Sequence, residues 1–201
     1  MLPAVFSPQD LAAIAAGFDR HWAMGMAYRA SFRHGNLFYR LGTDPRLGKI
    51  VRLVQWPCYG DPILEQVRRD PRLFEILGPL LGRDIKQIVN QLHWKPPGAA
   101  AADFAFHQDV RFRRPREAYR TLAVSYVQTG IAIDRHTREN GCMRVLPGSH
   151  LSGELAIPTP DHYLPFLSVL GLQRSDEQPA ILVGGEGTGI NGLGMLSFAL
   201  E

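Results

Sequence analysis

The chain has 201 residues, a net charge of +3, and contents of 45% hydrophobic and 20% charged residues. This length suits one domain with its own core, and the composition is typical of a soluble globular protein. The two cysteines, Cys58 and Cys142, form no CxxC pair, which argues against a disulfide framework or structural zinc. No apolar run reaches the roughly 18 residues of a membrane span, and the N-terminus lacks a signal-peptide pattern. We therefore expect a cytoplasmic protein that binds no membrane.

The first 82 residues are predicted to be mainly helical. Ser7 and Pro8 indicate a helix start, with a capping side chain before a proline, and apolar residues then recur at helical spacing as far as Trp22. A short strand is predicted over residues 36–41. Between residues 44 and 82, three Asp-Pro pairs each predict a helix start, with aspartate as the cap. These pairs are Asp44-Pro45, Asp61-Pro62 and Asp70-Pro71.

Strands are predicted to dominate after Gly82. They are expected over residues 85–95, 104–108, 121–133, 142–146 and 180–183. Strict alternation over 85–95 places Gln91, His93 and Lys95 on one face. Gly130, inside the predicted strand 121–133, indicates either a bulge or the close approach of a ligand. Helices followed by short antiparallel strands predict a single α+β domain whose β part is a sandwich or barrel.

His107 and Asp109 are the most informative residues. They lie two apart in an apolar, strand-like run, so an imidazole and a carboxylate share one face. Such a pair supplies two of the three ligands of the two-histidine, one-carboxylate triad that binds Fe(II) in non-haem oxygenases. The pattern therefore predicts two of the three ligands of an iron site, and the third ligand has to come from elsewhere in the chain.

Three segments together resemble the phytanoyl-CoA dioxygenase family. They are Gln91-Leu-His-Trp-Lys-Pro-Pro-Gly98, Phe106-His-Gln-Asp109 and Ile133-Asp-Arg-His-Thr-Arg-Glu-Asn-Gly-Cys-Met-Arg-Val-Leu-Pro-Gly-Ser-His150. The resemblance implies an Fe(II)- and 2-oxoglutarate-dependent oxygenase, with N-terminal helices on a double-stranded β-helix (jelly-roll) core. It makes His107 and Asp109 iron ligands, and it points to Gln91 and His93 as contacts of 2-oxoglutarate or substrate. A core histidine is an equal alternative for His93.

The resemblance also implies a second ligand histidine and an arginine for 2-oxoglutarate on a later strand, and neither follows Val183. We interpret residues 1–201 as one domain whose last strands, with that histidine and arginine, are missing after about residue 183. Three explanations stay open: a fragment or frameshift near residue 184, a shortened homologue without catalysis, or an unusual ligand such as His150 or His162. Residues 187–192 match GxGxxG, but a dinucleotide site also needs a following helix, a second strand and a later acid.

The function predicted on this basis is hydroxylation of an unactivated C–H bond in a small organic substrate. The carboxylate of Asp109 favours hydroxylation over halogenation, because related halogenases carry a small residue there. The alternative is a non-catalytic or truncated jelly-roll homologue that binds iron and 2-oxoglutarate weakly or not at all. An arginine cluster forms either a solvated loop or a rim that attracts an anionic substrate. Its members are Arg111, Arg113, Arg114, Arg116 and Arg120. No recognition helix accompanies it, so we expect no nucleic-acid partner.

Overall fold

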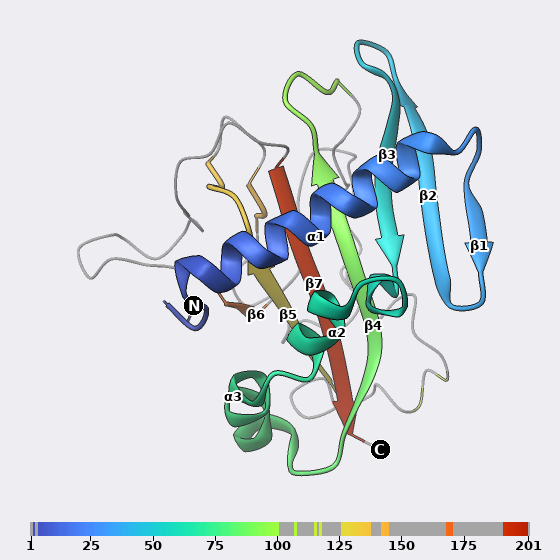
Figure 1. Cartoon of the computed structure of the whole chain (residues 1–201). Helices are drawn as coiled ribbons and strands as arrows, with labels where there is room; N and C mark the ends of the chain where they lie inside the picture. The colour runs from blue at the N-terminus through green and yellow to red at the C-terminus, as the bar shows by residue number, and fades with distance from the viewer. Residues whose placement is uncertain are drawn as a thin grey trace.

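The computed structural model describes residues 2, 4–100, 107, 115, 117, 126–137, 142–144, 168–170 and 191–200. Its elements are α1 (Pro8–Ala27), β1 (Phe32–His34), β2 (Leu37–Asp44), β3 (Gly48–Gln55), the short 3-10 helix η1 (Pro57–Tyr59), α2 (Pro62–Arg68), α3 (Pro71–Leu81), β4 (Ile85–Lys95), β5 (Tyr126–Ala132), β6 (Ser168–Leu170) and β7 (Asn191–Leu200). The seven strands form one sheet in the order β1-β2-β3-β4-β7-β5-β6. Figure 1 shows α1 crossing one face of this sheet. The predicted α+β class is confirmed, but the predicted order of helices first and strands later is wrong, because β1, β2 and β3 lie between α1 and α2. Among the described residues the sheet is a single open layer.

Helix α1 begins where the sequence predicts. The Ser7 hydroxyl accepts a hydrogen bond from the Asp10 amide at 3.1 Å, and the Asp10 carboxylate accepts one from the Ser7 amide at 2.9 Å. This reciprocal capping box satisfies two backbone donors that a helix start leaves unpaired. Further along, Phe18 and Trp22 pack against Trp94 of β4, with ring centroids 5.4 and 5.8 Å apart. The apolar stripe of α1 therefore closes the core between helix and sheet.

The Asp44-Pro45 pair turns a β-hairpin and does not start a helix, so that prediction is wrong. The Asp44 carboxylate accepts hydrogen bonds from the amides of Arg46 at 2.9 Å and Leu47 at 3.1 Å. Gly48, with φ of 71°, then leads into β3. An aspartate that caps a helix and one that closes a turn make the same side-chain to backbone bonds. Only the residues that follow decide between the two, and here they form β3.

The other two Asp-Pro predictions are confirmed. Asp61 caps α2 by accepting from the amides of Ile63 and Leu64, and Asp70 caps α3 by accepting from the amide of Arg72.

Among the described residues no helix is long and apolar enough to span a membrane.

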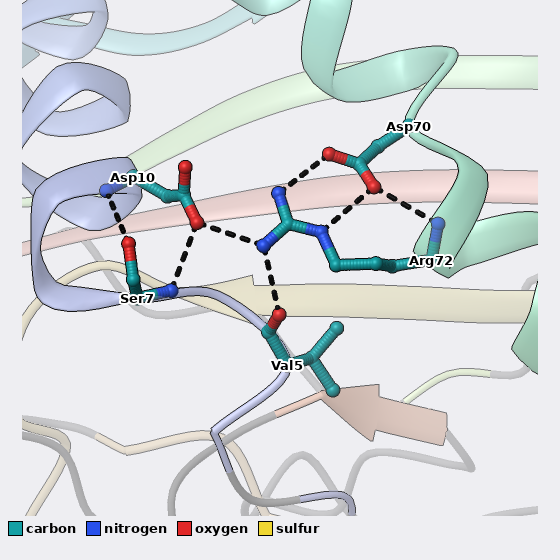
Figure 2. Close-up of polar contacts among 5 residues, drawn as sticks. All are labelled: Val5, Ser7, Asp10, Asp70 and Arg72. Atoms are coloured by element: carbon teal, nitrogen blue, oxygen red, sulfur yellow. Dashed lines mark hydrogen bonds and ion pairs between the residues drawn. The ribbon is translucent and has the colours of Figure 1, made fainter.

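Arg72 joins the starts of α1 and α3, as Figure 2 shows. Its guanidinium donates to the Asp10 carboxylate at 2.8 Å, to the Asp70 carboxylate at 2.6 Å, and to the Val5 carbonyl at 3.1 Å. The hydrogen bond from Arg72 is the main reason that the pKa of Asp10 falls to about 2. Because Arg72 and Asp10 are each more than a third exposed, salt screens their attraction, and the role of the contacts is mainly to orient the two helices.

Strand β4 is confirmed over residues 85–95, but its alternation is interrupted. Gln87 pairs with Phe198, and Val89 pairs with Ser197. β4 therefore carries one extra residue, Ile88, between two pairs that are adjacent on β7. This bulge puts the side chains of Gln87 and Val89 on opposite faces, whereas strict alternation predicts the same face. Gln87 therefore joins Leu92 on the helix-covered face.

The amide of Gln87 is buried on that face at a cost. Its Nε2 and Oε1 atoms both lie out of solvent, and within the described part of the chain neither has a hydrogen-bond partner. A buried polar group without a partner costs about 1–3 kcal/mol. We expect Gln87→Leu to raise the free energy of unfolding by about 1 kcal/mol, measured by urea denaturation, because leucine has a similar volume and no polar atoms. Gln66→Leu, on the exposed side of α2, is the matched control, and a Gln87→Leu protein less stable than wild type would contradict the prediction.

The later strands agree with the sequence only in part. Strand β5 confirms residues 126–132 of the predicted strand 121–133, and residues 121–125 lie outside the described part of the chain. Residues 142–144 form no strand, so the prediction of 142–146 is wrong there. The predicted strands 104–108 and 180–183 also lie outside the described residues, except for His107, which belongs to neither a helix nor a strand.

Strand β7 occupies a central position that the glycine-rich sequence did not predict. It pairs antiparallel with both β4 and β5, and Figure 1 shows it as the long red strand between them. Gly192 lies inside this strand, where a dinucleotide site would require the start of a helix. The rejection of the GxGxxG match is therefore confirmed at its last glycine.

Candidate functional site

The candidate site lies on the sheet face opposite α1. On β4, Leu92 and Trp94 are buried and pack into the core beneath the helices. Gln91 and His93 alternate with them and are half-buried. Because successive side chains of a strand point to opposite faces, Gln91 and His93 belong to the face that α1 does not cover.

Gln91 and His93 are joined by a side-chain hydrogen bond. The Gln91 Oε1 atom lies 3.1 Å from His93 Nε2. An amide oxygen can only accept, so His93 Nε2 carries the hydrogen and the Gln91 amino group keeps its two donors. The prediction that these two residues share a face is confirmed. His93 is half-buried and hydrogen-bonded to Gln91, whereas the neighbouring Trp94 lies in the fully buried core on the other face.

Strand β5 contributes to the same face through the strand between. Gln91 pairs with Met195 of β7, and Met195 pairs with Gly130 of β5. Gly130 therefore lies in the same cross-strand row as Gln91, and Gln128, which is 6% exposed, lies two residues along the same face. Thr129 is buried on the helix side. The glycine is in regular register with β7, so of the two alternatives the bulge is excluded at this pairing, and a position without a side chain faces the candidate site.

Two residues beside the Gln91–His93 pair lie on β3, a strand that the sequence did not predict. Gln55 of β3 pairs with Gln91, and Leu53 pairs with His93. Both were missed because residues 44–82 were interpreted as helical. The run Ile50 to Gln55, with its β-branched residues, is the signal that could have revealed β3. Gln128 lay within a correctly predicted strand, and only the pairing with β7 shows which face it joins.

The predicted metal ligands are only partly within the described structure. His107 is half-buried, whereas Asp109 lies outside the described residues. His150, His162 and the five arginines from Arg111 to Arg120 also lie outside them. Within the described residues no three histidine, cysteine, aspartate or glutamate side chains gather as a metal site. The pairing of His107 with Asp109 therefore stays a prediction from their spacing.

Comparison with known proteins identifies the family. The phytanoyl-CoA dioxygenase (PhyH) family matches residues 1–177, which is most of the chain. The chain belongs to the phytanoyl-CoA dioxygenase family. The resemblance carried by the three sequence segments is thereby confirmed.

Two curated relatives are dioxygenases by name. The chain is 37% identical over 75 residues to "Dioxygenase lolE1" of Epichloe uncinata, covering 37% of this chain and 26% of the relative. It is 28% identical over 102 residues to a probable alpha-ketoglutarate-dependent hypophosphite dioxygenase of Stutzerimonas stutzeri, covering 51% of this chain and 33% of the relative. The matched part is thus a third or less of each relative's length.

Solved structures support the fold. The non-heme alpha ketoglutarate dependent epimerase SnoN from nogalamycin biosynthesis superposes with a TM-score of 0.58 at 15% identity, covering 99% of this chain and 77% of SnoN. A second SnoN structure, in complex with Fe3+, alpha ketoglutarate and nogalamycin RO, gives a TM-score of 0.55 at 17% identity with the same coverage. At these identities the likeness concerns the fold alone, and it agrees with the predicted helices on a β core.

Proposed function

We propose that this chain is an Fe(II)- and 2-oxoglutarate-dependent dioxygenase that hydroxylates an unactivated C–H bond of a small organic substrate. The observation that carries the proposal is the Gln91–His93 pair. It presents polar atoms on the half-buried face of a sheet, in a chain of the phytanoyl-CoA dioxygenase family with a His-x-Asp motif. Polar groups fixed on a rigid strand are suited to orient a bound ligand.

The donor set of the motif fits iron. His107 offers an imidazole nitrogen and Asp109 a carboxylate oxygen, which are the ligand types of the facial triad that leaves coordination positions open. Bound Fe(II) with 2-oxoglutarate would supply the O₂ activation that C–H hydroxylation requires. In this proposal Gln91 and His93 orient 2-oxoglutarate or the substrate by donating and accepting hydrogen bonds. The arginine cluster after Asp109 would favour an anionic substrate.

A second candidate function follows from the last part of the sequence. Residues 184–201 contain no histidine and no arginine, so they do not supply the second ligand histidine and the 2-oxoglutarate arginine that the family resemblance implies. A chain with two protein ligands would hold iron weakly, and a 2-oxoglutarate carboxylate without a cationic partner would be costly to bury. The second candidate is therefore a non-catalytic family member that binds iron and 2-oxoglutarate weakly or not at all.

One anaerobic titration separates the two candidates. The purified chain is mixed with Fe(II) and 2-oxoglutarate, the visible metal-to-ligand absorption is recorded, and succinate is measured after O₂ is admitted. We expect the absorption band and succinate from the wild-type chain, and loss of both in His107→Ala and Asp109→Ala. His34→Ala, at an exposed position of β1, is the control and should behave as wild type. No band and no succinate from wild type would favour the non-catalytic candidate.

A further inference from the structure

We infer that Gln55 is a further ligand-binding residue, which together with Gln91 forms a paired-amide site for a small oxyanion such as a carboxylate. This inference rests on the proposed function, because it assigns the residue that would hold the acid group of 2-oxoglutarate or of the primary substrate. It extends the candidate site from β4 to the neighbouring strand β3.

The strand register places the two amides side by side. Gln55 and Gln91 are direct partners in the antiparallel pairing of β3 with β4. Directly opposed residues have Cβ atoms about 4.5–5.5 Å apart and project from the same face. Val54 and Leu92, the partners one position along, are both buried on the helix side, so Gln55 and Gln91 face the other way.

The hydrogen-bond donors of this pair are available to a ligand. Gln91 accepts from His93 through Oε1, which turns its amino group away from His93. In the described part of the chain, no hydrogen bond engages the amide of Gln55 or the amino group of Gln91. Gln55 is half-buried, so its amide is partly withdrawn from water. Two adjacent primary amides together offer up to four N–H donors, which is the complement of a carboxylate or a phosphorus oxyacid.

The charge along the same row also favours an anion. On β2, Phe38 pairs with Gln55, and on β1, Arg33 pairs with Phe38. The guanidinium of Arg33 lies over the Phe38 ring, 4.5 Å from its centroid. The row from β1 to β4 is therefore Arg33, Phe38, Gln55 and Gln91, with a cation at its outer end and no acidic side chain. A cation held in this way raises the electrostatic potential of the face without blocking the amides.

Calorimetric titration under anaerobic conditions with Fe(II) tests the inference by binding, without turnover. The probes are 2-oxoglutarate alone, and hypophosphite added with and without 2-oxoglutarate. Gln55→Met keeps the length of the side chain and removes its donors, and Gln55→Glu keeps the length and adds a repelling charge. Gln66→Met, at an exposed position of α2, is the matched control. Thermal unfolding of each variant checks that it folds. If Gln55→Met does not fold, the binding measured for Gln55→Glu provides the test.

We expect Gln55→Met to weaken binding of at least one probe about tenfold, and Gln55→Glu to weaken it further, because a hydrogen bond to a charged group is lost. The effects of Gln55→Met and Gln91→Met should be non-additive if one oxyanion touches both. Weaker 2-oxoglutarate binding would assign the pair to the co-substrate, and weaker hypophosphite binding alone would assign it to the primary substrate.

Unchanged affinity of Gln55→Met for every probe that wild type binds would overturn the inference and leave the proposed function standing. If wild type bound none of the probes, the proposed function would fail and the inference with it.

Discussion

Gly25→Ala should destabilise the protein by about 2 kcal/mol, because the end of α1 lies directly on the sheet. A Cβ atom on Gly25 would come within 2.6 Å of Val51 Cγ2 and 3.2 Å of Tyr39 Cδ1. Val51 and Tyr39 are both fully buried. Valine is restricted to few rotamers, so Val51 cannot turn aside easily and the helix has to move away from the sheet. The cost of overpacking then exceeds the gain in helix propensity.

Urea denaturation measures this effect, and the chain offers a matched control. Gly78 lies inside α3 with nothing within 4 Å of an added Cβ. Gly78→Ala should therefore stabilise the protein by about 0.5–1 kcal/mol through helix propensity alone. Val51→Ala should remove most of the penalty of Gly25→Ala in the double variant. A Gly25→Ala protein as stable as wild type would show that α1 does not approach β3 this closely.

The stability of the wild-type protein should fall as the pH drops below about 6.5, because of His21. This residue of α1 is 1% exposed, and its Nδ1 lies 2.5 Å from the hydroxyl of Tyr39. Burial lowers the pKa of His21, and the neighbouring charge of Asp61 opposes the shift only in part. Below the ordinary pKa of histidine, His21 is protonated in the unfolded chain and stays neutral in the folded chain. Lowering the pH therefore favours unfolding. Above that pH both states are neutral at this residue and its contribution is constant.

Urea denaturation between pH 5 and 7.5 tests this prediction. One proton taken up only on unfolding gives a slope of about 1.4 kcal/mol per pH unit at most. His21→Gln should flatten the pH dependence by up to that amount, even though the variant is less stable overall. His34→Gln, at an exposed position of β1, should leave the slope unchanged. Parallel pH profiles for wild type and His21→Gln would contradict the prediction, because they would mean that His21 has the same pKa in the folded and unfolded protein.

The three Asp-Pro pairs show which local structure can be predicted from a short sequence motif and which cannot. Two of them start helices as predicted, and the third closes the turn between β2 and β3 with the same kind of side-chain bond. The sequence around Asp44 is compatible with both outcomes, since a cap and a turn satisfy the same backbone donors. Pairing of β3 with the adjacent β2 and with β4 decides for the hairpin, and β4 is remote from the turn in the sequence.

The sequence by itself determined the family, the start of α1, strand β4 and the shared face of Gln91 and His93. These features depend on local spacing and on motifs, which a single segment carries whole. Only the tertiary structure decided that Gln55 stands beside Gln91, that β7 lies between β4 and β5, and that a bulge turns Gln87 into the core. Register between strands is set by long-range packing of one buried face, and no local pattern contains it.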